Sequence, residues 1–307
     1  MAAHHKIPSS APDTPSRNGG ATVRACGAAA PLSRSPCEPP AAPVDAASDS
    51  SEICRPMTTA DAQSSPGLTT EEYDGHWEND WSDFIRYNPG ARHRRRLILK
   101  MLAPVPFVSA LDAGCGNGEL LSTLRRRWPE RTFAGADLSP EVIARNRRRF
   151  PGVRFHLLNL EEGALDEQFD LVTCSEVVEH LNRQERGLRH LAAMTKPRGH
   201  VLVTCPTGAV YPTERTFGHV AHPSLADVER YARASGLDVV AALNWGWPLY
   251  KAMKWATNVN SRWALEHFAS GRYTAVAKLS SHAVYYANFA NVSSARGCQL
   301  FVLMQKR

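Results

Sequence analysis

The segment Ala110-Leu-Asp-Ala-Gly-Cys-Gly-Asn-Gly-Glu-Leu120 connects a short apolar run to an amphipathic one. Its glycines, Gly114, Gly116 and Gly118, fall at every second position. Glycine permits a positive φ and lets a ligand approach the backbone without a Cβ in the way. Amides beyond such a turn point from the helix N-terminus toward a ligand. The segment therefore predicts a ligand-binding turn between a strand and a helix.

An acidic residue follows at the spacing of a nucleotide-binding unit. Asp137 lies nineteen residues after Gly118, at the end of the next expected strand. A carboxylate there reaches both hydroxyls of a ribose. The dinucleotide pattern is Gly-x-Gly-x-x-Gly, whereas here Asp112 leads an Asp-x-Gly-x-Gly-x-Gly pattern. An acid suits a ligand with an ammonium group and no phosphate, so an NAD-dependent dehydrogenase is disfavoured.

Short apolar runs alternate with helical periods from about residue 71 onward. Strands separated by helices indicate a parallel sheet covered on both faces. Ser224 with Asp227 predicts a capping box, and Asn88-Pro89 predicts the start of a helix that runs to about Leu102. The expected strands are Ala110–Asp112, Thr132–Asp137, Val153–Leu158, Asp170–Cys174, His200–Cys205, Leu237–Leu243 and Gln299–Met304; the other expected helices are Glu119–Trp128, Pro140–Phe150, Arg183–Met194 and Leu225–Ala234.

Four segments resemble, in order and spacing, the motifs of class I S-adenosylmethionine-dependent methyltransferases. They are Leu111–Gly118, Ala136–Pro140, Phe169–Leu181 and Lys196–Pro206. The resemblance covers about residues 105–245 and the final strand. It implies an α/β, Rossmann-like, seven-stranded sheet of order 3-2-1-4-5-7-6, with the last strand antiparallel, helices on both faces and a helical cap. It also implies S-adenosyl-L-methionine as the cofactor.

The resemblance further implies which residues hold the cofactor. Asp137 matches the ribose-binding acid, and the glycine loop matches the positions along the methionine part. Asn159 stands where the family usually has an acid near the adenine, and its Oδ1 can still accept from the amino group. Ser175 is expected near the sulfonium. The full expected set is Asp112, Gly114, Cys115, Gly116, Asn117, Gly118, Asp137, Leu138, Asn159, Leu160 and Ser175.

Two segments carry candidate groups for the chemistry. Glu176-Val-Val-Glu-His180 follows the fourth strand and Gly218-His-Val-Ala-His222 follows the fifth, at the edge where open α/β sheets bind ligands. Methyl transfer requires alignment of the reactants and, for some acceptors, removal of a proton. We expect Glu176, Glu179 and His180 to share one face of a helical turn. The expected catalytic residues are His180, His219 and Glu179, with a neutral histidine as general base; the alternative is local packing.

The same segments permit a second interpretation as a metal site. The Glu-x-x-Glu-His run with a later His resembles small-RNA 2′-O-methyltransferases and some ubiquinone-pathway O-methyltransferases, where a metal holds the acceptor hydroxyls. Carboxylates and imidazoles are suitable ligands for magnesium or a transition metal. We expect no metal, and the alternative ligand set is Glu176, Glu179, His180, His219 and His222.

The N-terminal part of the chain differs in composition from the rest. Ten of the 21 prolines fall in residues 1–66, which are otherwise mostly Ala and Ser. Such a segment buries too little apolar surface to offset its ordering entropy. We expect residues 1–70 to be disordered and low in complexity, and residues 71–307 to form the domain. A transit peptide and a start at Met57 are the alternatives for this segment.

The overall composition is that of a globular protein. The chain has 307 residues, a net charge of +6 and 43% apolar residues. It has no run of eighteen apolar residues, so no membrane partner is expected. The seven cysteines form no CxxC pair, so we interpret them as reduced and the protein as cytoplasmic.

Aromatic and arginine clusters bear on the acceptor. Residues 245–290 are rich in aromatic side chains and are expected to form a helical lid or to close the core. Arginines at 92–96, 125–127 and 147–149 are expected on separate solvated helices, so nucleic acid is not an expected partner.

We predict a methyltransferase (EC 2.1.1.-) acting on an oxygen, or a nitrogen, of a small-molecule metabolite. An RNA methyltransferase and a catalytically silent cofactor-binding partner protein are the alternatives.

Overall fold

The computed structural model describes residues 86–260 and 273–307. The predictions for residues 1–70, and any for 71–85 and 261–272, lie outside the described residues. Among the helices that the structure describes, none is both long and apolar enough to cross a membrane.

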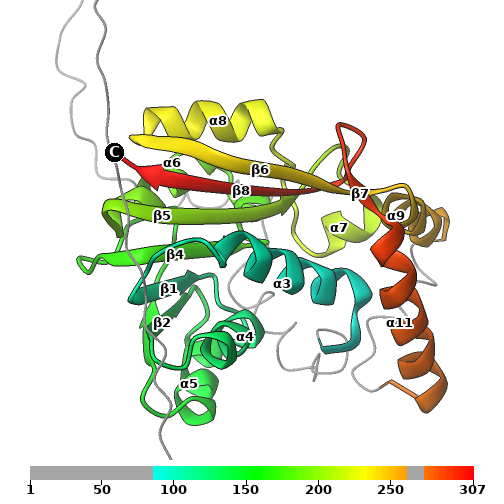
Figure 1. Ribbon diagram of the computed structural model, residues 1–307, viewed down its shortest axis with the longest axis horizontal. Helices are drawn as coiled ribbons and strands as arrows, with labels where there is room; N and C mark the ends of the chain where they lie inside the picture. Colours follow the sequence, from blue (N-terminus) through cyan, green and yellow to red (C-terminus); the bar gives the residue numbers. More distant parts are fainter. Residues whose placement is uncertain (1–85, 261–272) are drawn as a thin grey trace, which may run out of the picture. The chain divides into compact units, whose positions relative to one another are not determined.

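An eight-stranded sheet lies at the centre of the described residues (Figure 1). Its order is β3-β2-β1-β4-β5-β8-β6-β7, with the first five strands parallel and β8 antiparallel to both β5 and β6. The predicted order, with its antiparallel last long strand, is confirmed, and β7 adds a short edge strand that the sequence pattern did not predict. The bounds are β1 Ser109–Ala113, β2 Thr132–Asp137, β3 Arg154–Leu157, β4 Phe169–Ser175, β5 Thr195–Pro206, β6 Leu237–Trp247, β7 Val292–Ser293 and β8 Gln299–Lys306.

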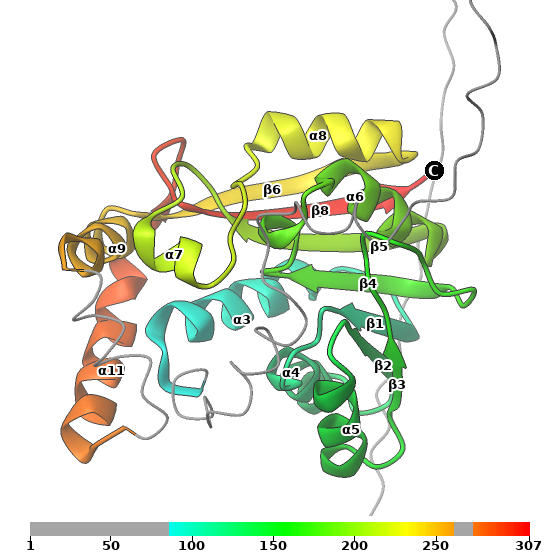
Figure 2. The same ribbon diagram turned by 180° about the vertical axis from the view of Figure 1, so that it is seen from behind.

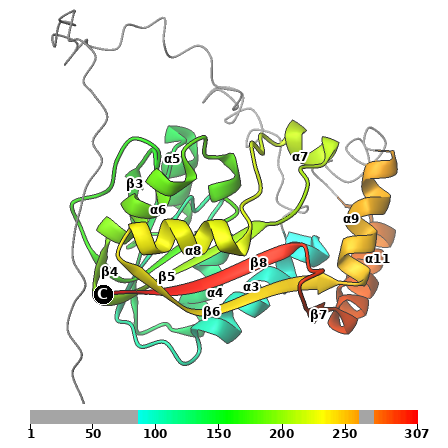
Figure 3. The same ribbon diagram turned by 90° about the horizontal axis from the view of Figure 1, so that it is seen from above.

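Helices cover both faces of this sheet, as predicted (Figures 2 and 3). On one face, Leu188 of α6 and Val228 of α8 belong to a buried cluster with residues of the sheet. On the other, Ile98 of α3 and Leu121 of α4 belong to a second cluster. The bounds are α3 Pro89–Leu102, α4 Glu119–Arg127, α5 Pro140–Arg149, η1 Val178–His180, α6 Gln184–Ala193, α7 Pro212–Thr216, α8 Leu225–Ala234, α9 Leu249–Val259, α11 Ala275–Ala287 and η2 Asn288–Ala290.

Local side-chain bonds explain where two of these helices begin. Asn88 Oδ1 accepts from the amide of Ala91 at 3.0 Å, and Pro89 occupies the first position of α3. Ser224 Oγ accepts from the amide of Asp227 at 3.2 Å, while the Asp227 carboxylate accepts from the amide of Ser224 at 3.0 Å. Both predicted caps are confirmed, so these boundaries follow from local sequence.

The carboxyl ends of β1, β4 and β5 lie at one edge of the sheet because these strands are parallel. The segments that follow them therefore meet at this edge. α9 and α11 lie beyond the end of β6 and the start of β8, away from the layers that cover the sheet (Figures 1 and 3). Neither of these two helices contains a buried residue.

Candidate functional site

The glycine loop after β1 is held by the neighbouring strand. The amides of Gly114 and Cys115 both donate to the carbonyl of Ala136 in β2, at 2.8 and 2.9 Å. Gly114, Gly116 and Gly118 all have positive φ, from 49° to 77°. The predicted turn between a strand and a helix, with positive φ at its glycines, is therefore confirmed, and the loop leads directly into α4.

Two of the loop glycines also leave no room for a side chain. A Cβ at Gly114 would collide with the side chain of Val177, and one at Gly118 would collide with Phe150. Val177 precedes η1, so the loop after β1 packs against the segment after β4. This contact brings the expected cofactor loop next to the expected catalytic segment.

The two acids of the motif lie on either side of this loop, and both are 2% exposed. Asp137 Oδ2 accepts from the amide of Gly116 at 2.8 Å, and its Oδ1 accepts from the amide of Ser139 at 3.1 Å. Asp112 Oδ1 accepts from the hydroxyl of Thr173 at 2.8 Å. Burial raises the pKa of Asp112 to about 7, and the charge of Asp137 adds to this rise.

Asn146 supports the loop from α5, and sequence reasoning missed it. Its Nδ2 donates to the carbonyl of Gly116 at 2.7 Å, and its Oδ1 is buried with no hydrogen-bond partner among the described residues. Arg149, one turn further on, donates to the carbonyl of Asn117 at 2.6 Å. The sequence pattern could have pointed to this residue, because Asn146 is polar but lies on the apolar face of α5, with Val142 and Ile143.

The other expected cofactor residues have different surroundings. Leu138 is 37% exposed next to Asp137. Asn159 is held in its own turn, since its Oδ1 accepts from the amide of Glu161 and its Nδ2 donates to Glu162. Leu160 is part of the buried core. The hydroxyl of Ser175 is 2.8 Å from that of Thr204 at the ends of β4 and β5.

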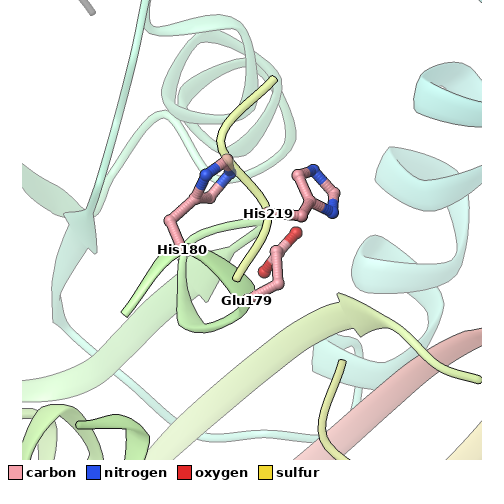
Figure 4. Close-up of side chains that lie close together, drawn as sticks. All are labelled: Glu179, His180 and His219. Atoms are coloured by element: carbon pink, nitrogen blue, oxygen red, sulfur yellow. The ribbon is translucent and has the colours of Figure 1, made fainter. Parts of the chain in front are cut away.

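A carboxylate and two imidazoles gather at the same sheet edge (Figure 4). Ligand atoms of Glu179, His180 and His219 lie within 4.8 Å of one another. Glu179 is fully buried in η1, and neither of its carboxylate oxygens has a hydrogen-bond partner among the described residues. The structure therefore unites the three expected catalytic residues, which come from two separate segments.

The hydrogen bonds of the imidazoles indicate which ring nitrogen of His180 carries a proton and which residues hold His219 in place. His180 Nδ1 is 3.1 Å from the carbonyl of Gly218, which can only accept, so Nδ1 carries the proton and Nε2 keeps a lone pair. His219 Nδ1 is 2.9 Å from His222 Nε2. Glu214 of α7 lies 3.6 Å from the same His222 nitrogen and pairs with Lys254 of α9. Glu214 and Lys254 were not among the residues expected from the sequence.

The position of Glu176 differs from the expectation. The prediction that it shares a helical face with Glu179 and His180 is wrong, because Glu176 has a φ of 60° and only Val178–His180 are helical. Its carboxylate accepts from Arg94 at 2.8 Å, from Thr204 at 3.1 Å and from Gln299 at 2.8 Å. Glu176 therefore joins β5, β8 and α3 rather than facing the imidazoles.

Burial dominates the electrostatics of the cluster. Burial raises the pKa of Glu179, and the nearby Glu176 carboxylate raises it further. Burial lowers the pKa of His180 and lowers that of His219 to about 2, with the neighbouring His180 and His222 adding to the second shift. The imidazoles are consequently neutral at physiological pH, with lone pairs available to a proton or a cation.

This fold and this edge define a Rossmann-like α/β protein with a ligand site at the carboxyl ends of its strands. The family described as "Methyltransferase domain" matches residues 73–242, and the chain belongs to that family.

Individual relatives are similar over the same region. A trans-aconitate 2-methyltransferase of Methylobacterium nodulans is 32% identical over 145 residues, which are 46% of this chain and 56% of that protein. The mitochondrial ubiquinone biosynthesis O-methyltransferase of Saccharomyces cerevisiae is 32% identical over 102 residues, 32% of this chain and 33% of that protein. The chain thus spans about half the length, or less, of these curated relatives.

One solved structure shows the shared fold. Phosphoethanolamine N-methyltransferase 2 of Haemonchus contortus, in complex with S-adenosyl-L-methionine, superposes with a TM-score of 0.52 at 17% identity. The superposition covers 78% of this chain and 60% of that one.

We predict that Asp112→Asn stabilises the ligand-free protein at alkaline pH. Because the folded state raises the pKa of Asp112 from 3.8 to about 7, ionisation destabilises the folded protein progressively as pH rises from about 4 to about 7. The variant, which cannot ionise, should therefore exceed the wild type in unfolding free energy by roughly 1–4 kcal/mol near pH 8.5, and by less than about 1 kcal/mol near pH 4.

Urea denaturation at both pH values measures this difference. Asp166→Asn, at an exposed position before β4, is the control and should show no comparable change with pH. A gap for Asp112→Asn that stays the same at both pH values would contradict the prediction.

Proposed function

We propose that this chain is an S-adenosyl-L-methionine-dependent methyltransferase that methylates an oxygen, or a nitrogen, of a small molecule. One observation carries the proposal: the glycine loop with Asp137 opens at the same sheet edge as the Glu179, His180 and His219 cluster. Membership of the methyltransferase family supports the reaction class. One relative, the ubiquinone biosynthesis O-methyltransferase, has O-methyltransferase in its name, which supports the preference for oxygen.

In this proposal the loop residues bind the cofactor by its polar ends. The carboxylate of Asp137 exchanges its bond to the Gly116 amide for the ribose hydroxyls, and ionised Asp112 faces the ammonium group. The amides of the glycine loop lie along the methionine part. Asn159 lies near the adenine, Leu138 contacts the cofactor beside Asp137, and Ser175 lies near the sulfonium. Leu160, which belongs to the buried core, supports the residues around the adenine from below.

In this proposal one histidine acts as the general base and a second histidine orients the acceptor. His180 Nε2 takes the proton of the acceptor group, because its Nδ1–H is already held by the carbonyl of Gly218. His219, fixed by His222, orients the same acceptor by a hydrogen bond. Methyl transfer then needs the nucleophile, the methyl carbon and the sulfur in line, which the adjacent loop and cluster provide. Glu179, which has a carboxyl oxygen within 4.8 Å of an imidazole nitrogen of His180 and of His219, positions these two side chains.

The small-molecule acceptor follows from the kind of relatives that the chain resembles. Lys254 supports Glu214 beside the cluster, and α9 and α11 serve as the lid over the acceptor. Among the described residues, the cysteines are buried and free, which fits a cytoplasmic protein. Arg125 and Arg149 lie over the ring of Phe150, so these arginines pack locally rather than forming a surface for RNA.

A second candidate role for the cluster is a divalent metal site. The specific observation that favours it is Glu179, whose buried carboxylate has no hydrogen-bond partner within residues 86–260 and 273–307 and lies beside two neutral imidazoles. Glu179, His180 and His219 would hold the ion, and Glu214 with His222 offers a second set around His219. The ion would supply Lewis-acid polarisation of an acceptor oxygen. Glu176 does not belong to either set.

We predict that Asp137→Ala weakens the binding of S-adenosylhomocysteine by about 1–3 kcal/mol, because the ribose hydroxyls lose their acceptor. Titration calorimetry measures this change. Asp166→Ala, at an exposed position, should bind as the wild type does. An unchanged affinity for Asp137→Ala would refute the cofactor assignment.

His180→Asn tests the base. The Asn amide can still donate to the carbonyl of Gly218, but the lone pair of Nε2 is gone. We expect turnover, measured as S-adenosylhomocysteine release over a panel of hydroxyl- and amine-bearing metabolites, to fall about 100- to 10,000-fold. Affinity for S-adenosylhomocysteine should be retained.

His190→Asn is the matched control for this change. His190 makes the same kind of bond, from Nδ1 to the carbonyl of Leu160 at 2.8 Å, but it lies on α6 outside the cluster. Full turnover by His180→Asn would remove His180 from the mechanism. A wild-type protein that binds the cofactor and turns over no acceptor of the panel would favour the silent-partner alternative.

Treatment with a chelator distinguishes the general-base role of His180 from a metal site at the same cluster. The acid–base mechanism predicts full turnover after treatment with excess EDTA. Loss of turnover that Mg²⁺, Mn²⁺ or Zn²⁺ restores would instead assign the Glu179, His180 and His219 cluster to a metal.

A further inference from the structure

The helices α9 and α11 turn apolar side chains away from the protein. In α9, Leu249, Trp255 and Val259 are 42–69% exposed. Their spacing places them on one side of the helix, together with the exposed Ala252 and Ala256. A helix that packs on a core shows the opposite arrangement, with its apolar stripe buried.

α11 repeats this arrangement. Val276, Leu279 and Tyr286 are 67–74% exposed and lie on one side of the helix. The polar residues His282 and Lys278 point inward instead, toward the ring of Tyr87. Exposed Phe289 of η2 stacks on Tyr286, and η2 contacts both α9 and α11. The element η2 thus links the two helices, and we call the exposed apolar residues of α9, α11 and η2 the α9–α11 surface.

The charged residues described at the border of this surface, Lys251 and Arg296, are both basic. Residues 239–307 contain a single acid, Glu266, which lies outside the described residues. Lys251 of α9 and Arg296 after β7 are joined at the border of the surface, where the Lys251 ammonium donates to the Arg296 carbonyl at 3.0 Å. The other described basic residues of this stretch do not belong to the border: Lys254 pairs with Glu214, Lys278 lies over the ring of Tyr87, and Lys306 and Arg307 lie at the far, C-terminal end of β8.

We propose that the α9–α11 surface binds the face of an anionic lipid bilayer. Helices with Trp, Tyr and aliphatic residues on one side and lysines near the border lie in the plane of a membrane interface. Basic residues add attraction to anionic headgroups. This is peripheral contact and needs no membrane-spanning helix. It goes beyond methyl transfer and does not depend on it.

Charge argues against a second copy of the chain as the occupant. A two-fold contact between copies brings the same patch together twice. Lys251 and Arg296 would then face further cations, with no acid of the described part of this surface to offset them. An anionic bilayer instead complements the same residues.

Co-sedimentation of the full chain with vesicles tests the proposal. We expect binding to phosphatidylcholine vesicles that contain about one third phosphatidylglycerol, and much weaker binding to phosphatidylcholine alone. Raising NaCl from about 50 to about 500 mM should weaken the binding, because screening reduces the attraction of the basic border.

The double variant Trp255→Gln/Leu279→Gln should bind these vesicles at least about tenfold more weakly. Val108→Gln/Val240→Gln is the matched control, because its residues are 62% and 50% exposed but lie outside the surface. Thermal unfolding and S-adenosylhomocysteine affinity verify that both variants are folded. These measurements do not use turnover, so their result is independent of the acceptor.

Two outcomes would overturn the proposal. One is a wild-type chain that does not bind anionic vesicles, in which case the surface is covered by other residues of the chain or by a protein. The other is equal loss of binding in both double variants. A change from dimer to monomer in Trp255→Gln/Leu279→Gln, without an effect on vesicles, would assign the surface to a contact between copies.

Discussion

The bond between the glycine loop and β2 is the constraint on which the rest of the site depends. Two successive amides, of Gly114 and Cys115, donate to the single carbonyl of Ala136. This bifurcated anchoring requires the positive φ of Gly114, and it brings the next residue of β2, Asp137, to the amide of Gly116. The loop is thereby preorganised for a ligand before the ligand arrives, which reduces the entropy lost on binding.

The candidate catalytic cluster contains buried polar groups that lower the stability of the folded protein. Glu179 is fully buried without a hydrogen-bond partner among the described residues, an arrangement that disfavours its ionised form. Asp112 is similarly destabilised beside the loop. Strained or unsatisfied groups of this kind concentrate at functional sites, because a ligand or substrate completes them. Both lie at the carboxyl edge of the sheet, Asp112 near the end of β1 and Glu179 in η1, which follows the neighbouring strand β4.

In contrast to these buried polar groups, α9 and α11 carry exposed apolar side chains beyond the end of β6 and the start of β8. Their aromatic residues have two different environments: Trp245, which precedes them, is buried against His93, whereas Trp255 and Tyr286 are largely exposed. A count of aromatic residues cannot separate these cases. Helical periodicity cannot do so either, because an apolar stripe has the same spacing whether it faces the core or the outside.

Local sequence determined the long strands, the caps at Asn88 and Ser224, the glycine turn and the acid at Asp137, because each depends on residues close together in the chain. It also determined that the segments after β4 and β5 meet, since parallel strands place their carboxyl ends together. Only the tertiary structure decided that Glu176 turns to Arg94 while Glu179 faces the imidazoles, that Asn146 holds the loop, and that Glu214 and Lys254 flank His222. These pairings join residues far apart in the chain, and their geometry depends on packing that no local pattern encodes.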